Sequence, residues 1–303
     1  MNKKVLIVGG SGFIAKNLIE KLVSESYDVS VYGRNSPSVC TANVRYIEGE
    51  LGTIASNMRD IDGSYFSDVI YLSNNIPVNS SVNNYNELVG INKIAIDYLC
   101  KVTSRFVFFS SGGRVYADSL FSHRETDLLG ARCLYGKSKI ELEHYVSAAA
   151  NINRCDFLIV RPSNPYGRYQ LLNSNQGLIS VTIGKVLSNS PVEIWGGGAE
   201  IRDYIFIDDF IDSFYRLLSF RALPYNIFNI GSGLGHSTLE VVTTILNLMG
   251  RHDVVVDKVN VNHALIPSNI LCNDRLYEVI GRKSYTSLSD GIRKLLDYHR
   301  NTP

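Results

Sequence analysis

The sequence predicts an α/β protein with a Rossmann-type, doubly wound parallel sheet and a smaller C-terminal lobe. Two observations lead to this prediction. Short apolar runs alternate with helix-length segments in the first half of the chain, and a glycine-rich turn follows the first run. Strands that alternate with helices are typical of a parallel sheet covered on both faces.

The predicted strands are short apolar runs with turn-forming residues at their ends. They lie at residues 5–8, 29–32, 44–47, 69–72 and 106–109, with one more at 157–160. Helices are expected between several of them, as at residues 14–24 and 87–101, and again at 135–150. This order is that of successive βαβ units.

The composition of the chain changes after Arg161 and Pro162. Residues 163–176 are rich in Asn, Gly, Pro and Tyr, and three glycines interrupt the chain again at 196–198. We predict a dinucleotide-binding domain over residues 1–163 and a second lobe over 164–303. Residues of about 205–230 are expected to return to the first domain.

Composition and charge exclude several functions. The 30 basic and 29 acidic residues almost cancel, so we expect no nucleic-acid or membrane partner. The five cysteines are scattered without metal spacing, and the six histidines show none either, so we expect no metal and no disulfide framework. The apolar run after the first four residues is too short for a signal sequence, and a cytoplasmic location is expected.

The glycine turn at the start of the chain predicts a dinucleotide site. Residues 4–15 read K-V-L-I-V-G-G-S-G-F-I-A, a strand followed by a turn and the start of a helix. Gly9 permits the tight turn, and Gly12 lets the backbone approach a pyrophosphate at the helix N-terminus. Phe13 and Ile14 begin that helix and are expected to bind the cofactor as well, together with Arg34, Tyr135 and Lys139 from later in the chain.

The end of the second strand bears on which dinucleotide binds. It reads Val31-Tyr32-Gly33-Arg34-Asn35, without the carboxylate that would hold the ribose diol of NAD. Arg34 is placed to meet a 2′-phosphate, which favours NADP over NAD. A merely solvated arginine is the alternative.

Tyr135 and Lys139 form the candidate catalytic pair. Side chains four residues apart lie on the same face of a helix, so the phenol and the ammonium can share one site. A nearby cation favours the phenolate, which makes proton transfer to or from an alcohol or ketone feasible near neutral pH.

Together, these motifs resemble the extended short-chain dehydrogenase/reductase family, specifically its nucleotide-sugar epimerases, dehydratases and 4-keto-sugar reductases. The resemblance implies that Tyr135 moves the hydroxyl proton of the sugar while a nicotinamide cofactor takes the hydride. Lys139 is then also expected to hold the nicotinamide ribose. The family's third catalytic position, a Ser or Thr, falls on Gly112, so Ser111 is the candidate to supply that hydroxyl.

The second lobe also carries family-like motifs. The run V-R-P-S-N-P-Y-G-R-Y-Q from Val160 implies that Asn164 contacts a nucleotide-diphosphate sugar. A later run begins R-D-Y at Arg202, where the resemblance implies contact with a nucleotide phosphate; a guanidinium suits phosphate oxygens. Asp208 and Asp209 are interpreted as helix-capping residues.

The leading functional prediction is a nucleotide-sugar 4-epimerase that acts through a 4-keto intermediate. The alternative is an NADPH-dependent reductase of an NDP-4-keto-6-deoxysugar, which Arg34 supports. A dehydratase is disfavoured, since Gly113 and Arg114 stand where those enzymes carry an Asp-Glu pair. A catalytically silent nucleotide sensor is a third hypothesis, motivated by Gly112. Family analogy also suggests a homodimer.

Overall fold

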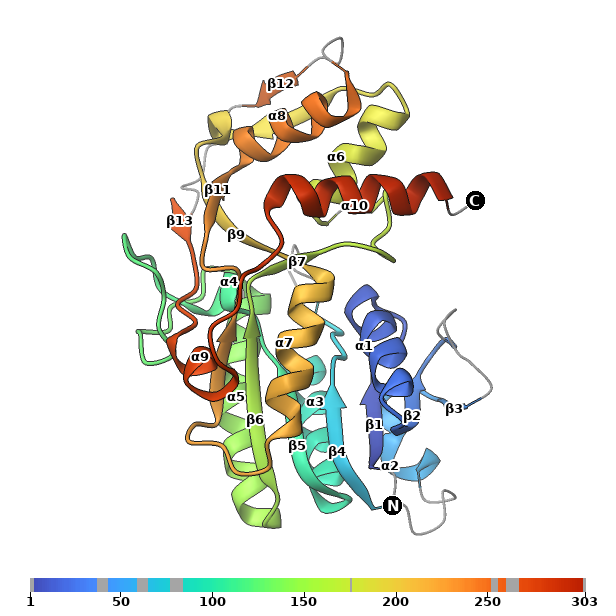
Figure 1. Cartoon of the computed structure of the whole chain (residues 1–303). Coiled ribbons are helices and arrows are strands. Elements are labelled where there is room, and N and C mark those ends of the chain that lie inside the picture. The colour runs from blue at the N-terminus through green and yellow to red at the C-terminus, as the bar shows by residue number, and fades with distance from the viewer. Residues whose placement is uncertain are drawn as a thin grey trace. The chain divides into compact units, whose positions relative to one another are not determined.

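The computed structural model describes residues 3–36, 43–58, 65–76, 84–174, 176–251, 256–259 and 267–301 (Figure 1). Cys40 lies outside these residues. The chain falls into two compact units, and each is described by itself. The first comprises Met1–Ala117, Leu128–Arg161 and Phe220–Phe228; the second comprises Asp118–Asp127, Pro162–Ser219 and Asn229–Pro303.

A seven-stranded sheet has the order β10-β6-β5-β4-β1-β2-β3. The pairs from β6 to β3 are parallel, and the order reverses direction at β1, as in dinucleotide-binding folds. The Rossmann-type prediction is therefore confirmed. The strands are β1 (Lys4–Val8), β2 (Asp28–Gly33), β3 (Val44–Glu48), β4 (Phe66–Tyr71), β5 (Thr103–Phe109), β6 (Asp156–Pro162) and β10 (Ile227–Ile230).

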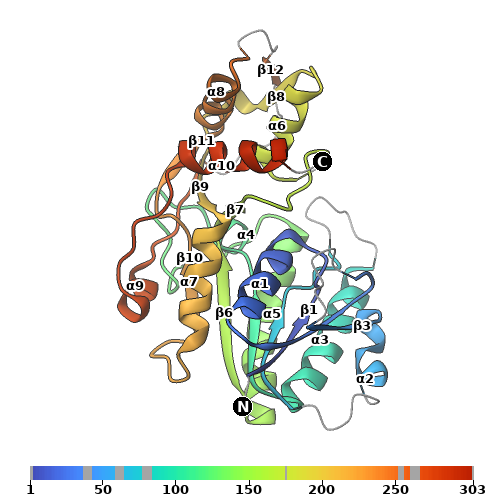
Figure 2. The ribbon, with the colours of Figure 1, turned by 45° about the vertical axis from the view of Figure 1, so that its right-hand side comes forward.

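Helices cover this sheet on both faces, with α1 opposite α3 and α5 (Figures 1 and 2). Successive strand side chains point to opposite faces, so Leu6 and Val8 of β1 share a buried cluster with Ile96 of α3 and Val146 of α5. The helical elements of the first unit are α1 (Phe13–Ser24), η1 (Leu51–Thr53), α2 (Ile54–Asn57), α3 (Tyr85–Lys101), α4 (Gly112–Val115) and α5 (Leu134–Asn153).

The second unit contains a four-stranded sheet, a two-stranded sheet and five helices within its described residues. In the larger sheet β9 pairs with β11, β13 and β7; in the smaller one β8 pairs with β12. Its elements are β7 (Asn164–Tyr166), α6 (Leu178–Leu187), β8 (Val192–Trp195), η2 (Gly196–Gly198), β9 (Ile201–Phe206), α7 (Ile207–Ser219), β11 (Gly235–Ser237), α8 (Thr238–Met249), β12 (Val256–Val259), β13 (Ser268–Asn269), α9 (Asp274–Ile280) and α10 (Leu288–Asn301).

Most element predictions differ from the structure only at their ends. Two strands begin three residues before the expected position: β4 at Phe66 and β5 at Thr103. Phe66 and Asp68 belong to β4 because they pair with β5, and a polar Asp breaks the apolar run that marks a strand in the sequence. In the structure the segment that rejoins the first unit is residues 220–228. The expected division at residue 163 into a dinucleotide-binding domain and a second lobe stays a prediction, because it assigns a function to each part.

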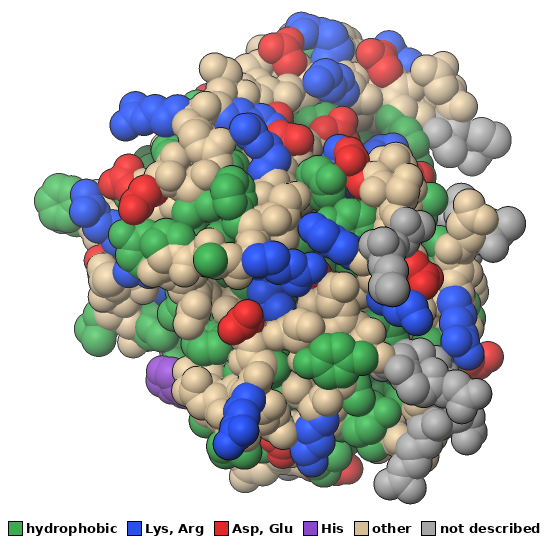
Figure 3. All heavy atoms as spheres, turned by 60° about the horizontal axis from the view of Figure 1, so that its bottom comes forward, with side chains coloured by type: hydrophobic (Ala, Val, Ile, Leu, Met, Phe, Trp, Pro, Cys, Tyr) green, Lys and Arg blue, Asp and Glu red, His purple; other side chains and the backbone are tan. Residues whose placement is uncertain are grey.

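The surface has mixed charge. Basic and acidic side chains are intermixed on the face shown in Figure 3, as the near balance of the whole chain predicts. Within the part of the chain that the structure describes, no helix is both long and apolar enough to cross a bilayer.

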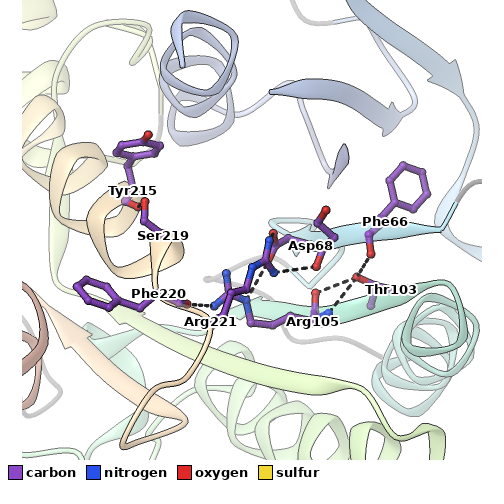
Figure 4. A network of polar contacts seen from close by, with 9 residues as sticks. Phe66, Asp68, Thr103, Arg105, Tyr215, Ser219, Phe220 and Arg221 are labelled. Carbon is purple, nitrogen blue, oxygen red and sulfur yellow. Dashed lines mark hydrogen bonds and ion pairs between the residues drawn. The ribbon is translucent and has the colours of Figure 1, made fainter. Parts of the chain in front are cut away.

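A buried carboxylate anchors the returning segment to the first unit (Figure 4). Asp68 of β4 accepts from Arg105 Nε of β5 at 2.7 Å and from Arg221 Nη2 at 2.9 Å. Arg105 also donates from Nη1 to the carbonyl of Phe220 at 2.6 Å. Asp68 and Arg105 are almost fully buried, whereas Arg221 is 43% exposed, so Asp68 joins a buried and a partly exposed arginine.

We predict that Asp68→Asn lowers the free energy of unfolding by about 3–5 kcal/mol, because it leaves buried Arg105 without its counter-ion. Thermal and urea unfolding would measure the loss. Asp297→Asn is the matched control, since Asp297 pairs with Arg300 on an exposed helix surface and should leave Tm almost unchanged. Equal Tm values for the two variants would contradict the anchoring role.

Candidate functional site

A pocket of about 440 Å³ lies at the carboxyl ends of β1 to β4. The glycine turn after β1 forms one wall, with Gly9 and Gly12, and Arg34 and Glu50 form another. In open parallel sheets, ligands bind at this edge where the strand order reverses. The glycine turn and Arg34 are thus brought to one pocket in the first unit.

Gly9 and Gly12 shape the turn in different ways. Gly9 has a φ of +93°, and a Cβ there would lie 2.7 Å from the backbone nitrogen of Ser73, so only glycine fits. A Cβ on Gly12, which precedes Phe13 and Ile14 at the start of α1, would meet no protein atom within 4 Å. Gly12 therefore leaves an open space in which a phosphate group of a ligand can approach the N-terminus of α1.

The tips of β2 and β3 form the far wall of this pocket. Arg34 and Asn35 follow β2, and the described end of that strand carries no carboxylate. Glu50 follows β3, and its carbonyl accepts a hydrogen bond from the Tyr32 hydroxyl at 2.7 Å. That bond fixes the turn containing Glu50 against β2. A guanidinium and a carboxylate therefore both border the pocket.

Sequence reasoning missed the pocket residues after β4, Asn74 and Asn75. Asn75 is held by buried Asn92 of α3, whose Nδ2 donates to Asn75 Oδ1 at 2.7 Å, and Tyr71 donates to Asn92 Oδ1 at 2.6 Å. The signal in the sequence that could have identified them is a pair of adjacent amide side chains shortly after a predicted strand. Their partner in α3 is seventeen residues away and could not be inferred from them.

The first turns of α5 carry Tyr135 and Lys139. Lys139 is only 4% exposed, and its Nζ donates to the carbonyl of Phe109 at the end of β5, at 2.9 Å. The ammonium lies 5.6 Å from the ring centre of Tyr135. Burial lowers the pKa of Lys139 to about 8, although the negative charge of Glu143 acts in the opposite direction.

The Tyr135 phenol has neighbours that counteract its burial. Burial raises the pKa of Tyr135 overall, although a hydrogen bond from the Ser111 side chain and the positive charge of Arg114 act in the opposite direction. Ser111 precedes α4, and Gly112, which has no hydroxyl, is the first residue of that helix. The structure therefore brings Ser111, Tyr135 and Lys139 together.

Glycine also permits the close approach of α4 to α5. A Cβ on Gly136 would lie 2.4 Å from the carbonyl oxygen of Arg114. This contact places the α4 backbone against the residue next to Tyr135. The position of Ser111 beside the phenol thus depends on a glycine one residue after Tyr135.

Asn164 and Arg202 belong to the second unit. Asn164 Nδ2 donates to the carbonyl of Asp203 at 2.9 Å, so part of this side chain supports the β7 and β9 pairing. Arg202 donates to the carbonyl of Ile201 at 2.8 Å. The neighbouring Asp203 is fully buried and accepts from the backbone nitrogens of Ser232, Gly233 and Leu271. Asp203 therefore fixes the loops around the strand that carries Arg202.

Asp208 and Asp209 lie within the first turn of α7 rather than before it, and Asp209 makes a contact that the capping prediction did not include. Its carboxylate accepts from the backbone nitrogen of Thr286 at 2.7 Å and lies 3.6 Å from Lys283 Nζ. It thus attaches a distant segment to the start of α7. Among the described residues, no cluster of His, Cys, Asp or Glu has the geometry of a metal site.

These features define a class of protein. A Rossmann-type sheet with a glycine-lined pocket at its switch point binds a dinucleotide, and a Ser, Tyr and Lys group suits proton transfer to or from a hydroxyl. A family model described as the NAD dependent epimerase/dehydratase family matches residues 5–231. The chain belongs to this family and is an NAD(P)-dependent enzyme.

Individual relatives fall into more than one activity class. The chain is 30% identical to a dTDP-4-dehydro-6-deoxyglucose reductase of Escherichia coli, over 96% of each chain. It is 27% identical to a putative UDP-glucose 4-epimerase of Methanocaldococcus jannaschii, over 98% of each chain. In fold it is similar to the UDP-glucose 4-epimerase of Thermotoga maritima, solved with UDP-glucose, with a TM-score of 0.88, 23% identity and 98% coverage of both chains.

We predict that Gly12→Ala weakens dinucleotide binding by about tenfold or more while Tm stays near that of the parent protein. The added methyl enters open pocket space and obstructs only a ligand. Gly9→Ala is the contrasting variant: it forces a methyl against the Ser73 backbone and should lower Tm. Isothermal titration calorimetry and thermal unfolding separate the two effects. Unchanged NAD and NADP affinity in Gly12→Ala would contradict the cofactor assignment.

Proposed function

We propose that this protein is a nucleotide-sugar 4-epimerase that works through a 4-keto intermediate. The observation that carries the proposal is the Ser111, Tyr135 and Lys139 group, which follows β5 in the same sheet whose other strand ends form the dinucleotide pocket. Relatives named as UDP-glucose 4-epimerases cover nearly the whole chain and support it.

The cofactor fits the first unit. Gly9, Gly12, Phe13 and Ile14 would hold its pyrophosphate, with Arg34 at the adenosine end. Lys139, whose ammonium lies between the Phe109 carbonyl and Tyr135, would also bind the nicotinamide ribose. When bound, the nicotinamide supplies a reversible hydride acceptor.

Tyr135 performs the proton transfer in this proposal. Its phenolate accepts the proton of the sugar 4-hydroxyl while the hydrogen on C4 leaves as hydride, which yields a 4-keto sugar. The Ser111 hydroxyl bonds to the phenol and can also hydrogen-bond to the oxygen on C4 of the sugar, from which Tyr135 takes the proton. Return of the hydride to the opposite face and of the proton from Tyr135 completes the inversion. No net reductant is consumed.

Substrate recognition is assigned to the second unit. We propose that Arg202 binds a phosphate of the nucleotide diphosphate through its guanidinium. Asn164 would contribute its side-chain oxygen and its second amide N–H, because the Asp203 carbonyl accepts only one of the two N–H groups. Relatives and neighbours that act on or bind UDP- and dTDP-sugars support a nucleotide-diphosphate sugar as the substrate class.

A reductase of an NDP-4-keto-6-deoxysugar is the second candidate. The 30% identity to a dTDP-4-dehydro-6-deoxyglucose reductase favours it, as does Arg34, since a consumed reductant is normally NADPH. The same three side chains would then deliver a proton to the 4-keto oxygen. Location in the cytoplasm and homodimerisation remain predictions.

Incubation with UDP-, dTDP-, GDP- and CDP-sugars, with and without NADPH, distinguishes these activities. Interconversion of 4-epimers without net cofactor loss supports the epimerase. Stoichiometric NADPH consumption on a 4-keto sugar supports the reductase and contradicts the leading proposal. Binding of nucleotide sugar without turnover would support the silent sensor and contradict both enzymes.

Tyr135→Phe is expected to reduce kcat by about 10²–10⁴-fold, because it removes the group that transfers the proton. Dinucleotide affinity should change little. Tyr145→Phe is the matched control on the same helix, since the Tyr145 hydroxyl bonds Asp97 of α3 and takes no part in the proposed reaction. Steady-state kinetics and cofactor titration measure both variants. A Tyr135→Phe enzyme with most of its activity would refute the mechanism.

Arg34→Ala is expected to raise the Kd for NADP about tenfold and to leave the Kd for NAD nearly unchanged, as loss of a guanidinium–phosphate contact requires. Fluorescence titration of the parent protein and the variant with both cofactors measures the ratio. Tighter binding of NAD than NADP by the parent protein would overturn the assignment of Arg34 to a 2′-phosphate.

A further inference from the structure

The face of α5 that carries the reactive pair continues one turn further, to Glu143. Tyr135, Lys139 and Glu143 are spaced by four residues, so the phenol, the ammonium and the carboxylate form one row. Lys139 is 4% exposed and Glu143 is 3% exposed. A buried cation and a buried anion are thus neighbours on the catalytic helix.

Arg161 of β6 already binds the carboxylate of Glu143. Arg161 Nε lies 3.0 Å from Glu143 Oε1 and Nη2 lies 2.6 Å from Oε2, which makes a bidentate ion pair. Arg161 is 2% exposed. Its Nη1 donates to the Tyr116 hydroxyl at 2.9 Å, and the guanidinium lies 5.0 Å from the centre of the Tyr116 ring. We call these three residues the Glu143 cluster.

The Glu143 cluster joins three segments around the site. Tyr116 directly follows α4, which begins after Ser111; Glu143 lies on α5, and Arg161 lies near the end of β6. A bidentate contact fixes the relative orientation of the guanidinium and the carboxylate as well as the distance between them. The cluster therefore holds the segment of Ser111 and the helix of Tyr135 at a defined separation.

The charges in this buried region are unequal. Lys139 and Arg161 are both cations, and Glu143 is the carboxylate that acts on them. The other titratable or charged groups nearby are Tyr116 and Tyr135, together with Arg114 and Cys133, which act on Tyr135. Burial lowers the pKa of Lys139, and the charge of Glu143 counteracts that effect. Because Arg161 engages both carboxylate oxygens, the Lys139 ammonium is bound instead by the Phe109 carbonyl.

We propose that the Glu143 cluster is a positioning device for Lys139, in which Glu143 keeps the ammonium charged and Arg161 prevents Glu143 from drawing it away from Tyr135. The inference depends on the proposed function in one respect only, namely that Lys139 takes part in the reaction. The protonation of Lys139 is a property of the protein alone and can be measured without substrate.

The two members of the ion pair should act on Lys139 in opposite directions. Glu143→Gln removes the favourable negative charge and leaves Arg161 facing the ammonium, so the pKa of Lys139 should fall by about one unit. Arg161→Gln frees the carboxylate to pair with Lys139, so the pKa should rise by about one unit. The double variant should lie between them.

The pKa is measured by NMR titration of protein labelled with ¹³C at the lysine side chains, with the Lys139 signal assigned by its loss in Lys139→Met. Glu141→Gln is the matched control: Glu141 of α5 pairs with Lys93 of α3 in a partly exposed ion pair, and its removal should not change the Lys139 titration. Where an active substrate is found, the alkaline limb of kcat/KM should move with the measured pKa.

A purely structural ion pair would lower Tm in both single variants without moving the Lys139 titration in opposite directions. Shifts of the same sign, or no shift, would overturn the proposal. If Glu143→Gln fails to fold, Arg161→Gln and the double variant still decide it, because a lowered or unchanged pKa in Arg161→Gln contradicts it. Absence of turnover on every sugar would refute the proposed function and leave the titration result standing.

Discussion

The proposed catalytic side of the first unit depends on the burial of one ammonium group. Lys139 is almost fully enclosed, and its Nζ is held by a backbone carbonyl rather than by a carboxylate. A cation kept in this way costs free energy, which is why its pKa falls to about 8. The buried ammonium lies 5.6 Å from the ring centre of Tyr135, the residue proposed to transfer the proton.

The surrounding structure supports this arrangement in several ways. The Phe109 carbonyl is available because β5 ends there, and the Ser111 hydroxyl reaches Tyr135 because the chain turns at once into α4. Gly136 lets α4 approach α5 closely enough for that contact. Ser111, the residue before Gly112, is therefore the residue proposed to supply the hydroxyl that Gly112 lacks. The positive charge of Arg114 counteracts part of the rise that burial causes in the pKa of Tyr135.

The two ends of the seven-stranded sheet use buried charge differently. At the amino ends of β4 and β5, Asp68 binds two arginines and attaches the returning segment 220–228. Near the carboxyl ends of the strands, Glu143 forms an ion pair with Arg161. Lys139 lies one helical turn from Glu143 and bonds the Phe109 carbonyl instead. Buried ion pairs add little stability over apolar packing but impose definite geometry. The first pair fixes the path of the chain, and the second fixes the charge next to the reactive phenol.

The sequence by itself determined the Rossmann-type fold, the glycine turn and the pairing of Tyr135 with Lys139. Each of these rests on local spacing: apolar runs of strand length, a turn that needs glycine at Gly9, and the four-residue repeat of a helix. Only the tertiary structure decided that Ser111 bonds Tyr135, that Asn92 holds Asn75, and that Arg161 and Tyr116 enclose Glu143. Those partners are distant in sequence, by 45 residues for Arg161 and Tyr116. Their contact depends on strand order and on how helices pack on the sheet, which no local pattern encodes.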